Sequence, residues 1–318
     1  MKRLVLLTKI VSKKIFNKNR IDKFLAQCFK KYSRNHFKKC IIKKYVTVND
    51  KIITSPDFKI KKGDIIHVKY YYKVVNYFTP EKIFLNIIYE DKYCLVINKP
   101  HSLVVHPGHG NYSGTLLNGL IYYYKDILNI PRAGIIHRLD KDTTGLIIIA
   151  KTISMYFLLK KMMKLRKIHR EYKALVFGKI KNEGLINAPI GRNKFKRTCM
   201  AVTLDGKESL TYYTVKKKYK FFTLLKLKLL TGRTHQIRVH MLHIKHPILG
   251  DQKYKCNLNF FKGFNNSILF NKVKNFHRQV LHAYKIKFIH PFKNKIIKLK
   301  IKFPQDIKKL LSILKKYK

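Results

Sequence analysis

The chain has 318 residues, of which 46% are hydrophobic, and this is enough apolar material to bury a core and to argue against disorder. Its apolar runs are far shorter than the roughly 20 residues that a transmembrane helix needs, which excludes a membrane-spanning segment and predicts no membrane partner. Seventy Lys and Arg against 16 Asp and Glu give a net charge of +54, so nucleic acid is the leading partner on charge alone.

The basic residues are unevenly divided, with 58 Lys and 12 Arg, and the chain has no Trp. This bias is typical of an AT-rich coding sequence, so part of the charge can reflect base composition rather than binding. Each remaining Arg is then a candidate for a position that requires a planar guanidinium. The cysteines are scattered without a CxxC pair, which predicts free thiols in a reducing compartment such as the cytoplasm: Cys28, Cys40, Cys94, Cys199 and Cys256.

The sequence predicts a small module over residues 1–75, with its core over about residues 20–70. The first twenty residues are basic, but no small-residue cleavage site follows them, so we expect a strand and a turn rather than a targeting peptide. Between Arg20 and Lys44 apolar residues recur at helical spacing. This pattern predicts two short helices, with Ser33 as the N-cap of the second.

A hairpin and a strand complete this predicted module. Apolar residues alternate over Val46–Ile53 around an Asn49-Asp50 turn, and they alternate again over Ile66–Tyr70. The second predicted helix is strongly basic on one face, through Arg34, Lys38, Lys39, Lys43 and Lys44.

The segment RIDKFLAQCFKKYSRNHFKKCIIKKYVTVND resembles the S4 RNA-binding domain, which presents a helix pair and a hairpin to folded RNA. The resemblance implies that RNA contacts come from Arg20, Arg34, Lys38 and Lys39. The alternative is a small structural domain whose lysine face is simply solvated.

A linker over residues 76–83 and a second domain over residues 84–318 are expected next. A helix is predicted over Ile153–Leu165 with Met155, Leu158, Leu159, Met162 and Met163 inward, and a last helix opens at Pro304 with Asp306 in its first turn. Strands are predicted over Tyr93–Ile97, Gly145–Lys151, Glu171–Ile180, Ser209–Tyr219, Thr223–Leu230 and Ile297–Phe303. This order favours an α+β fold with a central, mixed and largely antiparallel sheet flanked by helices.

The most informative stretch is PRAGIIHRLDKDTTGLIIIAK, residues 131–151, where polar residues interrupt two apolar runs. An acid here opposes the binding of a polyanion, so Asp140 should have a task other than affinity. It could be a metal ligand, a general acid or base, or a nucleophile, and the absence of a ligand pattern nearby disfavours the metal. Asp142 precedes Thr143 and Thr144, where a carboxylate can cap backbone amides, so Asp140 is the better candidate.

The motif HRLDKDTTG resembles the HRLDxxTSG signature of the RluA-type pseudouridine synthases. The segments INKPHSLVVHPG, GTLLNGL, REYKALVFG and TGRTHQIRVHM are similar to other parts of that family's active site. The resemblance implies Asp140 as the catalytic nucleophile, Tyr172 as a wall of the uracil pocket, and Arg238 as the partner of the catalytic carboxylate. It also implies that the reaction needs no cofactor and no metal.

The resemblance extends from about Arg20 to Asp306, and the order of an S4 module before a catalytic domain is that of the large-subunit ribosomal RNA synthases, the D type in particular. Two positions depart from the family pattern. Leu230 replaces a residue that is commonly acidic, and His101 replaces a residue that is commonly small. Thr144 in place of Ser is a mild substitution.

Two further clusters need an interpretation. Arg138, Arg233 and Arg238 remain Arg in a lysine-rich chain, as expected if each requires fork geometry, and we expect Arg138, Arg233 and His137 to contact RNA. The run His235, His240, His243 and His246 offers two HxxH spacings for zinc, but no Cys or acid lies within it. Bonding of His235 and His240 to backbone or RNA is the preferred interpretation. Lys99, Lys141 and Lys151 are candidates for phosphate contacts or for solvated surface lysines.

The resemblance predicts a monomeric enzyme that isomerises specific uridines of large-subunit (23S) ribosomal RNA or its precursor, in the stem-loop of an inter-subunit bridge. One alternative is a catalytically silent RNA-binding or ribosome-assembly factor. Another is a mitochondrial or plastid member of the family, which would differ in compartment and not in chemistry.

Overall fold

The computed structural model describes residues 2–12, 20–29, 32–73, 78–108, 110–255 and 267–316. The chain divides into two units, Met1–Asn76 and Tyr77–Lys318. Of the predicted linker over 76–83, residues 76 and 77 lie outside the described residues, and residues 78–86 run without helix or strand. Among the described residues, no helix is both long and apolar enough to cross a membrane.

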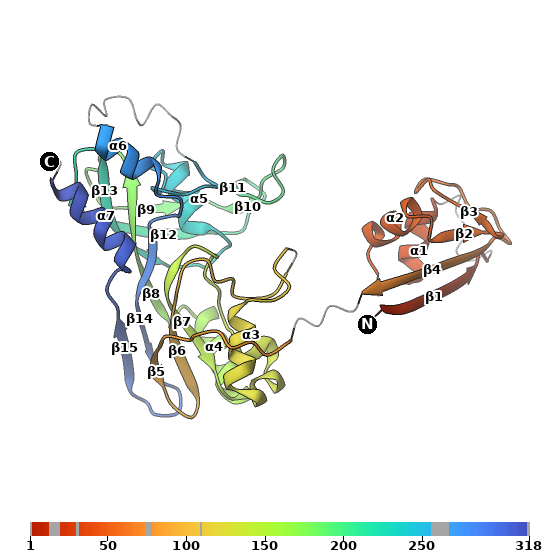
Figure 1. Cartoon of the computed structure of the whole chain (residues 1–318), viewed down its shortest axis with the longest axis horizontal. Helices are drawn as coiled ribbons and strands as arrows, with labels where there is room; N and C mark the ends of the chain where they lie inside the picture. The colour runs from red at the N-terminus through yellow and green to blue at the C-terminus, as the bar shows by residue number, and fades with distance from the viewer. Residues whose placement is uncertain are drawn as a thin grey trace. The chain divides into compact units, whose positions relative to one another are not determined.

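The N-terminal unit is a four-stranded sheet with two helices (Figure 1). Its strands pair in the order β1-β4-β2-β3, and β1 runs antiparallel to β4. The predicted strand at the N-terminus is therefore confirmed, whereas the turn predicted after it falls on residues 13–19, outside the described residues. The elements are β1 Lys2–Ile10, α1 Ile21–Cys28, α2 Arg34–Ile42, β2 Val46–Val48, β3 Lys51–Ile52 and β4 Ile65–Lys73.

Local signals account for the helices and the hairpin of this unit. The Ser33 hydroxyl accepts the backbone N–H of His36 at 3.2 Å, so Ser33 caps α2 as predicted. Asn49 and Asp50 both have positive φ, 46° and 64°, as a tight two-residue hairpin turn requires. Phe24, Leu25, Phe37 and Ile41 are fully buried between the helices and the sheet.

A mixed, largely antiparallel sheet of nine strands forms the centre of the C-terminal unit, as predicted. Its strands follow the order β5-β6-β7-β14-β8-β13-β12-β9, with β15 also paired to β14. Between the described strands, β7 and β14 make the parallel pairing of this sheet. The strands are β5 Ile87–Glu90, β6 Cys94–Lys99, β7 Thr144–Ala150, β8 His169–Phe177, β9 Gly184–Asn187, β12 Leu210–Lys218, β13 Phe222–Leu229, β14 Leu281–Ile289 and β15 Ile296–Lys300.

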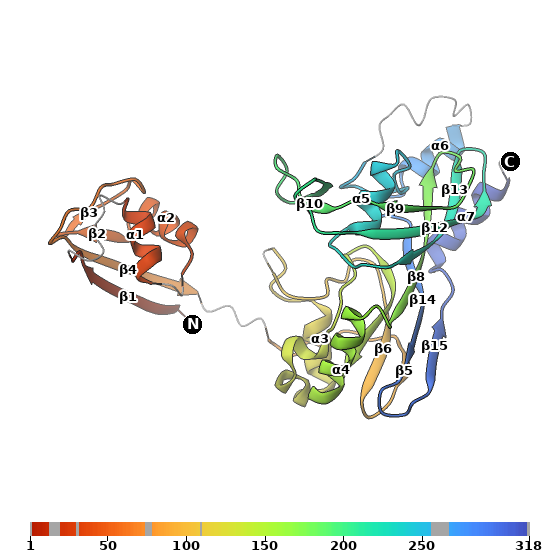
Figure 2. The ribbon, with the colours of Figure 1, turned by 180° about the vertical axis from the view of Figure 1, so that it is seen from behind.

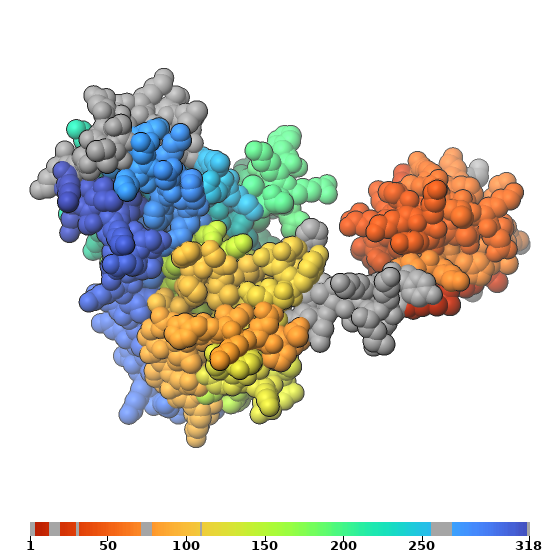
Figure 3. All heavy atoms as spheres, viewed as in Figure 1, coloured from red at the N-terminus to blue at the C-terminus, as the bar shows by residue number. Residues whose placement is uncertain are grey.

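Helices cover both ends of this sheet, and a small hairpin projects from the unit. The helices α3 and α4 lie beside β5–β7, while α6 and α7 lie beside the opposite ends of β8 and β13 (Figures 1 and 2). The hairpin of β10 Ile190–Arg192 and β11 Met200–Val202 protrudes on the surface (Figure 3). The helices are α3 Leu116–Tyr123, η2 Lys125–Asn129, η3 Pro131–Gly134, α4 Ile153–Lys164, α5 Gln236–His243, α6 Ser267–Lys274 and α7 Gln305–Lys316.

The predicted inward face of α4 is correct in part. Met155 and Leu159 are fully buried and Met162 and Met163 are half-buried, but Leu158 is 36% exposed. The reason is geometric, because residues 155, 159 and 162 follow the helical period and Leu158 lies at the margin of that stripe.

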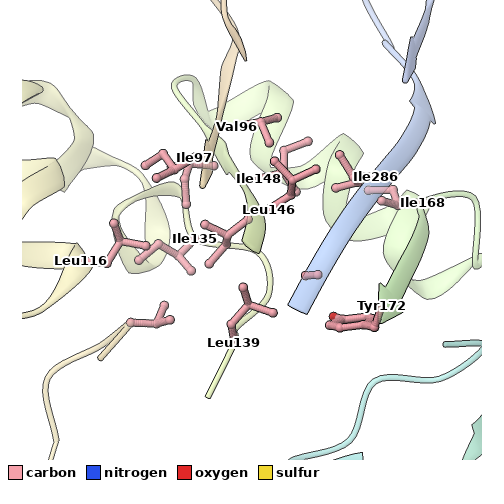
Figure 4. Packing of buried hydrophobic residues seen from close by; sticks show 14 of the residues in the cluster. Val96, Ile97, Leu116, Ile135, Leu139, Leu146, Ile148, Ile168, Tyr172 and Ile286 are labelled. Atoms are coloured by element: carbon pink, nitrogen blue, oxygen red, sulfur yellow. The ribbon is translucent and has the colours of Figure 1, made fainter. Parts of the chain in front are cut away.

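The largest core cluster extends to the site described below. Figure 4 shows Leu139 and Tyr172 at the lower edge of a layer that contains Ile148, Leu146 and Ile286. Side chains at this edge are therefore held by close packing rather than by loop contacts alone.

Candidate active site

Asp140 lies on the short loop between η3 and the buried strand β7. The loop enters β7 at Gly145. The φ of Gly145 is +120°, and a Cβ built there would lie 2.3 Å from the carbonyl oxygen of Ala283. Only glycine permits this close parallel approach of β7 to β14. The Thr143 amide donates to the backbone carbonyl of Asp140 and not to the Asp142 side chain, so the predicted capping role of Asp142 is wrong for this amide.

Side chains from β14 and the segment before it hold the rest of the loop. Gln279 donates to the Thr143 hydroxyl at 3.1 Å, and the Thr144 hydroxyl lies 2.8 Å from Nδ1 of His282. Both contacts are made by hydroxyl groups, and Thr144 supplies the same hydroxyl that Ser would at this position.

Lys99 holds the Asp140 loop in place through hydrogen bonds to backbone carbonyl groups. Its Nζ donates to the carbonyl oxygens of Pro100, Leu103 and Lys141 at 2.7, 2.9 and 2.8 Å, and the residue is fully buried. Burial lowers the pKa of Lys99 to about 7, although Asp142 and Asp140 act in the opposite direction. The interpretation of Lys99 as a phosphate contact is therefore wrong, because its ammonium group has no access to a ligand.

Replacing Lys99 with Met should destabilise the C-terminal unit. The change leaves three carbonyl groups without their donor, and we expect a loss of about 3 kcal/mol in the free energy of unfolding. Urea unfolding measures this loss, with Lys141→Met as the matched control because the Lys141 side chain is exposed on the same loop. Equal unfolding midpoints for the two variants would show that Lys99 does not hold the loop.

Arg238 on α5 connects Asp140 to a second carboxylate. Its Nη1 donates to Asp140 Oδ2 at 2.9 Å, so the predicted pairing is present. The fork geometry expected of Arg238 is directed at Asp251 and not at Asp140, because the two parallel bonds go to Asp251, from Nε at 2.6 Å and from Nη2 at 2.8 Å. Burial works to lower the pKa of Arg238, but the bonds to Asp251 outweigh it and the net shift is upward. Asp251 thus orients the guanidinium that faces Asp140.

His235 is a second neighbour of Asp140. It is the N-cap residue of α5 with φ +56°, and its Nε2 lies 3.8 Å from Asp140 Oδ1. The Tyr254 hydroxyl accepts the amide of Met200 and lies 2.7 Å from Nδ1 of His235, so Tyr254 orients the ring whose Nε2 faces Asp140. Burial lowers the pKa of His235, which keeps the ring neutral near pH 7.

A cavity of about 260 Å³ opens at Asp140. Tyr172 on β8 lines it and is only 4% exposed, and burial raises the pKa of its hydroxyl. Five of the 12 Arg residues line the cavity, whereas no Lys is found among its described lining residues, in a chain with 58 Lys. The arginines are Arg132, Arg138, Arg170, Arg233 and Arg238. Such a bias indicates that guanidinium geometry, and not charge alone, is needed at this cavity.

The sequence-predicted RNA contacts of this unit divide into two kinds. Arg138 and Arg233 are exposed at the cavity, where a nucleic acid can reach them. His137 is buried, and its Nε2 accepts the amide of Ile148 at 3.1 Å. Burial lowers the pKa of His137 to about 3, so it stays neutral. His137 also lines the cavity, so it supports the loop from a buried position and its contact with RNA stays a prediction.

The predicted basic residues of the N-terminal unit converge on Asp22. This carboxylate is fully buried, and Arg34 donates to it through Nε at 3.0 Å. Arg20 lies 3.3 Å and Lys38 4.0 Å from it, while Lys39 is exposed nearby on α2. Each of the three paired cations is about half exposed, so one carboxylate holds them together at the surface.

The histidines of the suspected zinc run do not gather around one point. His240 contacts the Thr211 hydroxyl and the Ala188 carbonyl, and His246 contacts the Phe177 carbonyl. Another trio, Asp91, Cys94 and His290, brings possible ligand atoms within 4.8 Å of one another. Asp91 there already accepts bonds from Lys293, Tyr89 and two backbone amides, which describes an ion-paired turn rather than an open metal site.

Comparisons with known proteins agree with this geometry. Residues 93–243 match the family described as RNA pseudouridylate synthase, and residues 19–66 match the S4 domain. A Buchnera aphidicola protein named Ribosomal large subunit pseudouridine synthase D is 47% identical over 308 residues, covering 96% of this chain and 97% of that protein. The protein of the same name from Escherichia coli is 41% identical over 296 residues, covering 93% and 90%.

Solved structures show the same fold. Human RNA Pseudouridylate Synthase Domain Containing 1 superposes with a TM-score of 0.55 at 23% identity, over 73% of this chain and 95% of that one. Human RNA Pseudouridylate Synthase Domain Containing 4 gives 0.56 at 24% identity, over 72% and 93%. From the shared sequence over nearly the whole chain, this protein belongs to the RNA pseudouridylate synthase family.

Proposed function

We propose that this protein converts specific uridines of large-subunit ribosomal RNA, or of its precursor, to pseudouridine, with Asp140 as the nucleophile and without a cofactor. One observation carries the proposal: the Asp140 carboxylate pairs with Arg238 and lies at a cavity that Tyr172 lines. The names of the relatives support ribosomal RNA of the large subunit as substrate. Within the large-subunit RNA, we propose the stem-loop of an inter-subunit bridge as the modified site.

The reaction breaks the bond between ribose C1′ and uracil N1 and forms a bond between C1′ and C5. The C5 proton is lost and N1 gains one, so no oxidant or reductant is needed. Asp140 would act by attack on the ribose, by attack on the uracil ring or by assisting elimination at the ribose, and all three routes suit a carboxylate at this place. Because burial raises the pKa of Tyr172, its phenol is neutral at pH 7, and we assign it to packing against the uracil.

The target uridine must leave its helical stack to reach Asp140, because the carboxylate is largely enclosed. Arg138 is exposed at the mouth of the cavity, and we propose that it fills the space that the flipped base leaves. The remaining exposed arginines, Arg132 and Arg233, suit phosphate groups of the surrounding RNA.

Comparing pseudouridine positions in ribosomal RNA from cells with and without this protein tests the proposal and identifies the uridines. Loss of modification only in large-subunit RNA is the expected result. An unchanged pattern, together with RNA binding by the purified protein, would favour the silent assembly factor instead. We also propose that the protein is a monomer in the bacterial cytoplasm, which size-exclusion chromatography of the purified protein and fractionation of the same cells would test.

Deleting residues 1–75 should separate affinity from chemistry. The deletion removes the cations around Asp22 and Lys39 but leaves Asp140, Tyr172 and Arg238 in a unit with its own core. We expect affinity for structured RNA to fall by at least about tenfold, because several phosphate contacts are lost, while turnover at saturating enzyme is retained in part. Filter binding and single-turnover assays measure the two effects. A folded but fully inactive truncation would contradict this division of roles.

A further inference from the structure

A second cavity, of about 270 Å³, adjoins the one at Asp140. The two share Met163, Arg170, Leu229 and Gly232 in their walls. The described lining of the second cavity contains no carboxylate, and it is cationic through Lys164, Arg166, Arg170 and Lys228. His169 also lines it, but burial lowers the pKa of this ring, so it adds no positive charge near pH 7. Arg166 is partly neutralised by Glu208 at 3.4 Å, which stands outside the cavity. Among the described residues, Lys164, Arg170 and Lys228 form no ion pair, and a cavity lined by such cations suits an anion.

Arg170 stands at the junction of the two cavities. It lies on β8 two residues before Tyr172, so both side chains project from the same face of the strand. Within the described part of the chain its guanidinium forms no ion pair, and its Nε is buried without a hydrogen-bond partner. A Cβ built on Gly232 would lie 3.2 Å from both Nη1 and Nη2, so the missing side chain at 232 leaves the space that the guanidinium occupies.

An unpaired buried guanidinium N–H is unfavourable unless a ligand satisfies it. We propose, resting on the function given above, that Arg170 and the second cavity bind the backbone phosphate next to the target uridine, so that the RNA strand leaves the active cavity through the second one. Residues two apart on a strand are separated by roughly 7 Å, which is within the span of one nucleotide. With the uracil against Tyr172, a neighbouring phosphate therefore reaches Arg170, and Lys164 and Lys228 extend the cationic path.

The rival ligand for Arg170 is a carbonyl oxygen of the flipped uracil. A phosphate contact is made by the RNA before and during the chemical step, so its loss weakens binding and leaves the chemical step nearly intact. A uracil contact in the active cavity would instead change the limiting rate. The two ligands therefore predict different kinetic results for the same variant.

The first experiment compares Arg170→Met, Arg170→Lys and the control Arg192→Met, which removes an exposed Arg of the same unit outside both cavities. Single-turnover rates are measured against enzyme concentration on a synthetic stem-loop that carries a mapped target uridine. Arg170→Met should raise the half-saturating concentration about tenfold with the limiting rate within about threefold, and Arg170→Lys should recover part of the loss. The control should stay within about twofold of wild type. Melting curves show whether each variant is folded.

The second experiment replaces single phosphates on either side of the target with neutral methylphosphonates. Wild-type enzyme should lose affinity at one position in particular, and Arg170→Met should lose nothing further at that position while responding normally at the others. Equal responses of the two enzymes at every position, or a fall in the limiting rate alone, would overturn the phosphate assignment. If wild-type enzyme isomerises the RNA and Arg170→Met behaves like Arg192→Met, the inference fails while the proposed function stands. If wild-type enzyme isomerises no RNA, the proposed function itself is wrong.

Discussion

Asp140→Asn is expected to abolish isomerisation, lowering the rate by at least about 10⁴-fold, because an amide cannot replace a carboxylate nucleophile. The amide keeps the shape of the side chain and can still accept a hydrogen bond from Arg238 Nη1. Release of tritium from uracil C5 in labelled ribosomal RNA measures the loss.

RNA affinity provides the internal control for this variant. Removing one negative charge from a cavity lined by five arginines should leave affinity equal or higher, with no loss of salt dependence. Filter binding over a range of salt concentrations tests this expectation. Tritium release at the wild-type rate would refute the nucleophile assignment, and the silent-binder alternative predicts no release from either protein.

Arg238→Lys should have the second largest effect, a fall in the single-turnover rate of about 100-fold or more. Lysine keeps the charge, but its single ammonium cannot bind Asp251 through two bonds and still direct a donor to Asp140 2.9 Å away. Asp251 is fully buried, so weakening its pair should also destabilise the fold by about 3 kcal/mol.

A matched variant separates the two effects of this change. Asp251→Asn keeps Arg238 and its bond to Asp140 but weakens the group that orients the guanidinium, so we expect a smaller loss of rate at a similar loss of stability. Rates must be compared well below the melting temperature of each variant. A near-normal single-turnover rate for Arg238→Lys at saturating enzyme would show that the arginine is not needed at Asp140.

Much of the fold could be predicted where the local sequence carries its own signal. The Ser33 cap, the Asn49-Asp50 turn and the alternation over β15 are such cases. Helix α3 was missed because it is buried on nearly every side and so has no amphipathic stripe. Helix α5 was missed because its N-cap, His235, is left-handed and offers no side-chain cap, so no start signal precedes it.

The site was predictable only as far as its motifs reach. Asp140, Tyr172 and Arg238 follow from the family resemblance, and the structure brings them to one cavity. The roles of Asp251 and Lys99 depend on which groups the fold places beside them, and no spacing rule contains that information. One available signal for Asp251 was the scarcity of acidic residues, because it is one of only 16 Asp and Glu residues in the chain.

The parallel pairing of β7 with β14 has a consequence for the order in which this protein matures during synthesis. His282 contacts Thr144 from 138 positions further along the chain, so the Asp140 loop cannot be completed until that segment has left the ribosome. The basic N-terminal unit ends at Asn76 and can fold much earlier. At about 5–20 residues per second the interval is on the order of 10 to 40 s. A nascent chain therefore carries a finished cationic module, tethered beside ribosomal RNA, well before it becomes a competent enzyme.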